Sequence, residues 1–192
     1  PEEFAVKHPL QHTWTWWYDN PRRRTNQRNW SNNLKKVYTF GTVEDFWSLW
    51  NNIKGAHELP HGSNYHVFKD GISPTWEDSA NSVGGKWIIQ LRNNQRDSML
   101  NNCWMSAVLA CIGCSLEEEK EDICGIVVSV RKAADKICLW TRNAKDKENC
   151  LLIGTRLREL LNLPNLKIGY QAHQDAMNSN SSFGNKNLYE VK

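Results

Sequence analysis

The chain has 192 residues, a formal net charge of +3 and 40% hydrophobic residues. This length suits one domain with a sizeable core, and the small net charge argues against a long polyanion groove while allowing a local basic patch. No apolar run approaches the roughly 18 residues that cross a membrane, and we expect no signal peptide at the start of this sequence, a leader removed earlier being the alternative. We expect a loose N-terminal arm over residues 1–9 and a single domain over residues 10–192.

Ten tryptophans are spread along the chain, which is too many and too scattered for one core cluster. Several should therefore face a ligand or a partner. The six cysteines lie mostly within apolar runs, which is typical of buried thiols in a reducing compartment. We expect a cytoplasmic protein, with a nuclear fraction as an alternative, and a monomer that does not associate with membranes.

In chain order, the first predicted element is a strand over residues 13–18, where threonine and aromatic residues partly alternate. An arginine-rich segment over residues 20–29 lacks apolar residues and predicts a loop. We interpret its charge as a solvated face rather than a nucleic-acid site, because the run is short. Trp30 emerges from the far end of this loop.

A helix is predicted to begin after Thr42, whose side chain can cap it, while Glu44 and Asp45 suit the positive end of its dipole. Apolar residues follow at helical spacing up to residue 53. Trp47 lies at the edge of the apolar arc, so periodicity leaves open whether this ring is core margin or exposed anchor.

The rest of the chain predicts further strands, two further helices and an Asn/Ser/Gly-rich tail over residues 177–187. Ser98 is expected to cap the second helix. Antiparallel strands with separated helices indicate an α+β domain, with one sheet and helices on one face. The predicted strands cover residues 65–69, 86–91, 123–130, 136–140 and 166–170, and the helices cover residues 98–112 and 146–161.

Residues 73–78 (Ser-Pro-Thr-Trp-Glu-Asp) place a tryptophan and a carboxylate side by side after a proline. Pro74 lacks a backbone donor and favours a turn, so Trp76 and Glu77 are expected on a loop. A flat cation suits such a pair, because it can stack on the ring and donate to the carboxylate. The alternative is that Trp76 folds back onto the core.

Other residues complete a candidate site of the same kind. Trp30 and Trp76 both leave polar loops, and Arg131 and Lys136 flank a hairpin turn. Together with Glu77 these are the groups that would hold a planar cationic base carrying phosphates. Spacing alone does not show that the loops converge.

A series of short motifs, each weak alone, follows one another from His8 to about Val191. They are His-Pro-Leu-Gln (8–11), Thr-Val-Glu-Asp-Phe-Trp (42–47), Phe-Lys-Asp-Gly-Ile (68–72), Trp-Glu-Asp (76–78), Gly-Gly-Lys-Trp (84–87), Ile-Cys-Gly (123–125), Val-Arg (130–131) and Lys-Ile-Cys-Leu-Trp (136–140). In this order they resemble the eukaryotic translation initiation factor 4E family, the mRNA cap-binding proteins. The resemblance implies a curved antiparallel β-sheet of about eight strands backed by three helices on the convex face. It implies no enzymatic activity and no cofactor or metal.

By this resemblance, the 7-methylguanine of the cap stacks between two tryptophans, while a carboxylate accepts from its N1 and N2. The backbone N–H of the second stacking residue donates to O6. A third tryptophan touches the methyl group, and basic residues bind the phosphates. The matching residues are Trp30 and Trp76 for stacking, Glu77 for the carboxylate, Trp140 for the methyl group, and Lys86, Arg131 and Lys136 for the phosphates.

The resemblance also implies a partner surface on the convex face, where the family receives a helical Tyr-x-x-x-x-Leu-apolar peptide. Scaffold initiation factor 4G and the 4E-binding repressor proteins carry this peptide. The matching residues are His8, Pro9, Val43, Trp47 and Leu109.

At three places the chain departs from the family pattern. Ser106 stands where a glutamate is common on the convex face, so we expect a weaker peptide contact. Lys86 replaces an arginine common in animal members, which keeps the charge but not the planar fork. Residues 177–187 do not align without a gap. A sister branch that represses translation commonly has Tyr at the first stacking position, so Trp30 favours the initiation-type branch, although residues 85–89 resemble the sister branch too.

Two further alternatives stay open from the sequence. An aromatic cage with a carboxylate also suits methyl-lysine, although Arg131 and Lys136 would then have no role. The second alternative is an enzyme, because Cys111 and Cys114 have the spacing of a redox motif. Their place at a helix C-terminus disfavours a thiolate, so buried thiols are the preferred interpretation.

Overall fold

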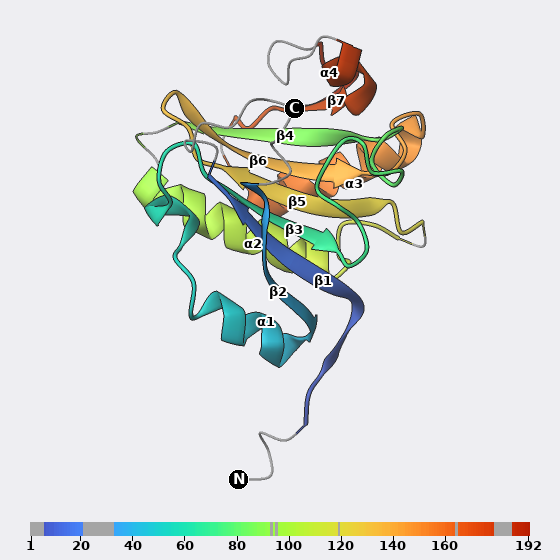
Figure 1. Cartoon of the computed structure of the whole chain (residues 1–192). Coiled ribbons are helices and arrows are strands. Elements are labelled where there is room, and N and C mark those ends of the chain that lie inside the picture. The colour runs from blue at the N-terminus through green and yellow to red at the C-terminus, as the bar shows by residue number, and fades with distance from the viewer. Residues whose placement is uncertain are drawn as a thin grey trace.

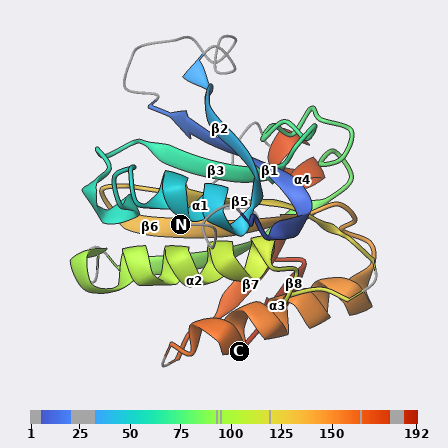
Figure 2. The same ribbon diagram turned by 90° about the horizontal axis from the view of Figure 1, so that it is seen from below.

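Eight strands form one antiparallel sheet, with helices packed against one of its faces (Figures 1 and 2). The computed structural model describes residues 6–20, 33–92, 94, 96–118, 120–163, 165–178 and 186–192. The strand order is β2-β1-β3-β5-β6-β4-β7-β8, so β2 and β8 are the edges. The strands are β1 (Pro9–Asp19), β2 (Lys35–Thr42), β3 (Asn64–Lys69), β4 (Gly85–Arg92), β5 (Ile123–Ser129), β6 (Ala134–Thr141), β7 (Ile168–Ala172) and β8 (Tyr189–Val191). The helices are α1 (Val43–Trp50), α2 (Asn101–Ile112), α3 (Lys147–Leu161) and α4 (His173–Asn178), with short helical turns η3 (Ala56–Glu58) and η5 (Arg96–Leu100).

Alternation along the central strands gives the sheet two different faces. On β4, Trp87, Ile89 and Leu91 belong to the core on the helix side, whereas Ile88 lies in a second, smaller cluster with Trp140. The helices α1, α2 and α3 cover the first face (Figure 2). We call the second face, which carries Phe68, Ile88, Cys138 and Trp140, the open face.

Tryptophan builds much of the core between sheet and helices. Trp16 of β1 contacts Trp104 of α2 and Trp50 of α1 edge-on, with ring centroids 5.8 and 6.1 Å apart. Trp87 of β4 donates its indole N–H to the carbonyl of Cys150 in α3 at 3.0 Å. Four tryptophans, Trp14, Trp16, Trp87 and Trp104, share this one buried cluster. Trp140 and Trp76 lie in the second cluster and Trp47 is exposed, so the tryptophans do not all share one core cluster, as expected from their number.

Residues 7 and 8 of the predicted N-terminal arm contact helix α1. Lys7 and His8 pair with Asp45 and Glu44 of α1 at 2.7 and 2.6 Å, and β1 begins at Pro9. The hydrogen bonds from His8 lower the pKa of Glu44 to about 2. These contacts tie the start of β1 to α1, and residues 1–5 of the predicted arm lie outside the described residues.

Two of the three predicted helix starts are confirmed. Thr42 accepts from the N–H of Asp45 at 3.2 Å, and Asp146 caps α3 by accepting from the N–H of Asn149 at 3.2 Å. The cap expected at Ser98 was wrong, because this residue lies inside η5, which runs directly into α2. A helical turn that continues into the helix leaves no exposed helix start for a side chain to cap.

The structure also contains three elements that carried no sequence prediction, namely β2, β8 and α4. The α+β architecture with one curved antiparallel sheet is confirmed, and α4 adds a short fourth helix to the three expected. Among the described residues, none of the helices combines the length and apolarity of a membrane span.

Candidate functional site

The candidate site lies on the open face, where Trp140 of β6 occupies its centre. Trp140 packs edge-on against Phe68 of β3, with ring centroids 5.4 Å apart and an interplanar angle of 78°. It is paired with Lys86 in the β4–β6 register. Because residues of one face alternate along a strand, Lys136, Cys138 and Trp140 all lie on this face. The structure therefore brings three of the predicted residues, Trp140, Lys86 and Lys136, onto one surface.

The β3–β4 loop, drawn in green in Figure 1, brings Trp76 to the same cluster. The Asp78 carboxylate accepts from the N–H groups of Ser73 (2.7 Å) and Ala80 (2.9 Å). The Asn81 amide, which is fully buried, donates to the carbonyls of Ser73 and Thr75 at 2.8 Å each. The loop is thus held in shape by two polar side chains that the sequence did not single out.

Trp76 is half-buried at the edge of this cluster, whereas Glu77 is exposed. Among the described residues, neither the backbone N–H of Trp76 nor the carboxylate of Glu77 has a hydrogen-bond partner. A planar ligand could therefore stack on the Trp76 ring, accept from the Trp76 N–H and donate hydrogen bonds to the Glu77 carboxylate. Trp30, the other predicted stacking residue, lies outside the described residues.

Lys86 lies almost buried on the open face, at 9% exposure. Within the described part of the chain, its ammonium group makes no hydrogen bond or ion pair. Lysine is rarely buried without a partner, because the charge loses hydration. An anion bound at this place would supply that partner.

Arg131, at the end of the β5–β6 hairpin, is held by three hydrogen bonds. Its Nη1 donates to the carbonyls of Ser63 (3.2 Å) and Val130 (3.0 Å), and its Nη2 donates to Oδ1 of Asn64 at 2.8 Å. Burial lowers the pKa of Arg131, while the nearby carboxylate of Asp19 raises it. Of the five N–H groups of a guanidinium, the one on Nε and one on Nη2 have no described partner and can reach a phosphate.

The hairpin that carries Arg131 and Lys136 is fixed beside its turn by an ion pair between Arg96 and the buried Asp135. Asp135 accepts from Arg96 Nε at 2.6 Å and from the backbone N–H of Arg131 at 2.9 Å. Lys136 is paired with Gln90 in the β4–β6 register, four residues along β4 from Lys86. The two lysines are therefore about 13 Å apart along the sheet at a rise of about 3.3 Å per residue. Lys86 of β4 thus lies beside Trp140, whereas Lys136 lies nearer the turn of the β5–β6 hairpin.

His173 also lies at this site, although no sequence motif surrounds it. Its ring lies against Trp140, with centroids 4.1 Å apart, and its backbone N–H donates to the Gly84 carbonyl at 3.0 Å. Burial, and then the positive charge of Lys86, lower the pKa of His173 to about 3. The imidazole is therefore neutral at neutral pH and adds no positive charge behind Trp140. Only the fold could reveal that His173 lies next to Trp140, since α4 brings the ring back over β4 and β6.

The second predicted surface lies on the outside of the helical layer. Val43 and Trp47 are one turn apart on α1, and each side chain is 37% exposed. Leu109 of α2 is half-buried, while His8 and Pro9 are exposed at the start of β1. We call these five residues the partner surface. The structure resolves the ambiguity at Trp47 in favour of an exposed ring.

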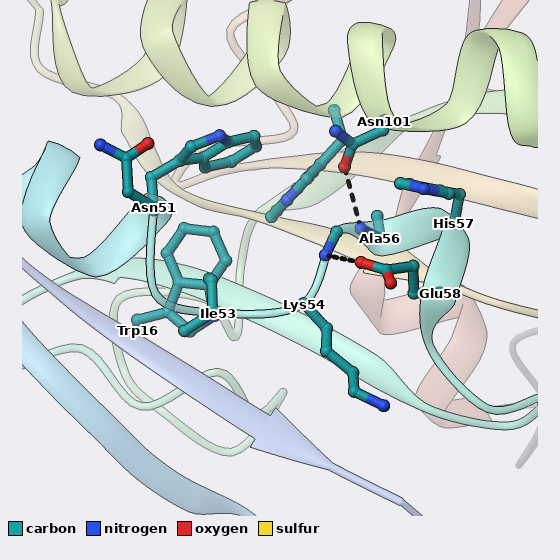
Figure 3. A pocket seen from close by; sticks show the side chains of 11 residues that line it. Trp16, Asn51, Ile53, Lys54, Ala56, His57, Glu58 and Asn101 are labelled. Carbon is teal, nitrogen blue, oxygen red and sulfur yellow. Dashed lines mark hydrogen bonds between the residues drawn. The ribbon is translucent and has the colours of Figure 1, made fainter.

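A pocket of about 210 Å³ lies elsewhere, between the end of α1, η3 and α2 (Figure 3). Two of its polar side chains bind backbone groups of the pocket wall: Asn101 accepts from the N–H of Ala56, and Glu58 accepts from the N–H of Gly55, both at 2.9 Å. None of the predicted site residues that the structure describes lines it. This pocket is therefore separate from the candidate site.

The redox alternative finds no support in the cysteine environments. Burial raises the pKa of Cys111 well above its usual value, and it also raises that of Cys114. Raised pKa values leave the thiols protonated and poorly nucleophilic. Within the described residues, no group of three or more His, Cys, Asp or Glu side chains could hold a metal ion.

Comparison with known proteins agrees with this geometry. The family model described as "Eukaryotic initiation factor 4E" matches residues 9–188. The eukaryotic translation initiation factor 4E of Aplysia californica is 42% identical over 174 residues, covering 90% of this chain and 80% of the relative. The human protein of that name is 42% identical over 184 residues, covering 95% of this chain and 82% of the relative.

Solved structures show the same fold. Ascaris suum eIF4E-3 in complex with an m2,2,7G cap has a TM-score of 0.87 and 38% identity, covering 97% of this chain and 99% of the other. C. elegans eIF4E-3 with the 4E-binding protein Mextli and a cap analog has a TM-score of 0.86 and 37% identity, covering 97% and 100% of the two chains. This chain therefore belongs to the eukaryotic initiation factor 4E family of translation factors.

Proposed function

We propose that this protein binds the 7-methylguanosine cap of mRNA on its open face and recruits proteins to its partner surface during translation initiation. In this proposal Trp76 and Trp30 stack on the two sides of the 7-methylguanine, and Glu77 accepts from its N1 and N2. Trp140 touches the methyl group, and Lys86, Arg131 and Lys136 bind the phosphates. Translation of capped mRNA implies a cytoplasmic location.

The observation that carries the proposal is the nearly buried Lys86 beside Trp140, on the face to which the Trp76 loop is pinned. The ammonium group of Lys86 has no partner among the described residues, so a bound anion would stabilise it, and the rings of Trp140 and Trp76 favour a flat group. A methylated guanine nucleotide offers both. Its positive base also suits a neutral His173 behind Trp140 better than a charged one.

The relatives support this assignment. The solved structures of Ascaris suum eIF4E-3 contain an m7G cap in one case and an m2,2,7G cap in another. A methyl-lysine reader would leave Lys86 and Arg131 without a purpose, so the cap is the better ligand.

The proposal predicts strong selectivity for the methylated base. Methylation at N7 makes guanine cationic, and a desolvated cation gains about 2 kcal/mol per indole face, whereas neutral guanine gains only ordinary stacking. 7-Methyl-GTP should therefore bind at least about 100-fold more tightly than GTP, which is about 2.8 kcal/mol. Titration followed by tryptophan fluorescence quenching measures both affinities. Equal binding of the two nucleotides would refute cap recognition.

For the partner surface, the exposed ring of Trp47 predicts separable effects on binding and stability. Trp47→Ala should leave the thermal midpoint nearly unchanged, because the ring is 37% exposed. It should weaken a helical Tyr-x-x-x-x-Leu peptide by about 2 kcal/mol or more, as expected for a truncated interface anchor. Calorimetry with the peptide measures the loss.

Leu188→Ala, another exposed apolar residue, next to β8 at the far edge of the sheet, is the control and should retain the peptide affinity. Severe destabilisation of Trp47→Ala, with unchanged peptide affinity per folded molecule, would assign Trp47 to the core instead. Because Ser106 stands in place of a glutamate, the unmutated protein should bind the peptide less tightly than a member that has the glutamate.

A further inference from the structure

A buried chain of polar side chains lies behind Arg131. The Nη2 group of Arg131 donates to Oδ1 of Asn64 at 2.8 Å. The Nδ2 group of Asn64 donates to both carboxylate oxygens of Asp19, at 2.8 and 3.0 Å. His66 Nε2 lies 2.6 Å from Asp19 Oδ1. Asp19, Asn64 and His66 are all buried, and they join β1 to β3 beneath the end of the β5–β6 hairpin.

The direction of the hydrogen bonds in this buried series is determined by Arg131 at one end and Asp19 at the other. An asparagine amide can present either its oxygen or its nitrogen to a neighbour. An ionised carboxylate only accepts hydrogen bonds, so Asp19 attracts the nitrogen of Asn64. The oxygen of Asn64 then faces Arg131, whose guanidinium only donates. Each bond therefore runs in the same direction, from Arg131 through Asn64 to Asp19.

We propose that Asp19 is a positioning residue for the phosphate contact: by fixing the orientation of the Asn64 amide, it holds the guanidinium of Arg131 where its remaining N–H groups meet the cap phosphates. This inference rests on the proposed function. Asp19 is fully buried and touches no ligand itself. Its effect reaches the ligand only through Asn64 and Arg131.

The substitution Asp19→Asn separates positioning from simple electrostatics, because the two predict opposite signs. If Asp19 acted only through its charge, its removal would strengthen phosphate binding, since a nearby negative charge repels an anion. If Asp19 positions Arg131, a neutral amide in its place holds the nitrogen of Asn64 less firmly, because one amide oxygen is a weaker acceptor than the two oxygens of a carboxylate. Asn64 would then lose part of its fixed orientation, and the guanidinium of Arg131 would lose it with Asn64.

The test compares the affinities of 7-methyl-GTP and 7-methylguanosine, which share the base and differ in the phosphates. In Asp19→Asn the triphosphate should bind about tenfold more weakly, the size of one hydrogen bond to a charged group, while the nucleoside changes by less than about twofold. We call the dissociation constant of the nucleoside divided by that of the triphosphate the phosphate ratio. Partial unfolding weakens both apparent affinities by the same factor, so it leaves the phosphate ratio unchanged. Glu148→Gln, an exposed carboxylate-to-amide change on α3, should leave both affinities unchanged.

A swap of the two residues provides the rescue. In Asp19→Asn combined with Asn64→Asp, the carboxylate at position 64 accepts both from Arg131 and from the amide at position 19. The direction of the bond from Arg131 is therefore kept, and the phosphate ratio should return to within about threefold of the unmutated protein. Asn64→Ala should lower the phosphate ratio, and this variant tests the chain if Asp19→Asn does not fold.

An unchanged phosphate ratio, or tighter binding of the triphosphate, in Asp19→Asn would overturn the proposal. So would a lowered ratio that the swap leaves uncorrected, because the loss would then not depend on amide orientation. If the unmutated protein itself failed to prefer 7-methyl-GTP over GTP, the proposed function would fail, which is a different result from a normal cap preference with no effect at Asp19.

Discussion

Asp135→Ala should lower the free energy of unfolding by about 3–5 kcal/mol, the range for removing one partner of a buried ion pair. The Asp135 side chain is fully buried and accepts three hydrogen bonds, two from Arg96 (2.6 and 2.7 Å) and one from the backbone N–H of Arg131 (2.9 Å). Removing the carboxylate deprives the Arg96 guanidinium, whose side chain is only 14% exposed, of two charge-assisted hydrogen bonds. Chemical denaturation at neutral pH measures the change.

The neighbouring Asp97→Ala is the matched control for this substitution. Asp97 lies in the same helical turn as Arg96, η5, but is exposed, so its removal should change stability by less than about 0.5 kcal/mol. A loss below about 1 kcal/mol in Asp135→Ala would show that water replaces the carboxylate beside the hairpin turn.

Trp76→Leu should remove most of the preference for 7-methyl-GTP over GTP. Loss of one indole face forfeits about 2 kcal/mol of cation–π stabilisation for the methylated base, or roughly 30-fold, and less for neutral guanine. Leucine still covers the apolar cluster around Trp140, and Asp78 and Asn81 still hold the loop, so the fold should persist. Isothermal titration calorimetry is the suitable measurement, because the substitution itself alters tryptophan fluorescence.

Trp50→Leu provides the control for the loss of a half-buried tryptophan. This residue packs against the helix-side core, away from the open face, so its removal should leave the selectivity between the two nucleotides unchanged. If Trp76→Leu retained the full selectivity, Trp76 would be a packing residue and the stacking role would be wrong.

The sequence by itself determined those features that depend on neighbours along the chain. The caps at Thr42 and Asp146 each satisfy an N–H three residues away, so local residue types predict them. The central strands β3 to β6 are apolar enough to be recognised from composition. The order of strands and helices indicated one sheet, Pro74 indicated a loop for Trp76 and Glu77, and the ordered motifs identified the family.

Some local signals were insufficient because tertiary packing decided the outcome. The edge strand β2 is mostly exposed, and β8 has only three residues, so neither carries a clear apolar pattern. Ser98 is a good capping residue in isolation, yet η5 continues into α2 and makes a cap unnecessary. The exposure of Trp47, at the edge of its apolar arc, likewise depends on which face of α1 meets the sheet.

Only the tertiary structure decided how the candidate site is supported. Asn64 meets Asp19 and Arg131 across 45 and 67 residues of sequence, and Arg96 meets Asp135 across 39. His173 reaches Trp140 because β7 pairs with β4 and brings the start of α4 over the open face. Such contacts leave no periodic or local trace, since they depend on strand order and on the burial of polar groups that must then be hydrogen-bonded. The chain thus determines which chemical groups are available, and the packing of distant segments determines which of them are held in position to bind a ligand.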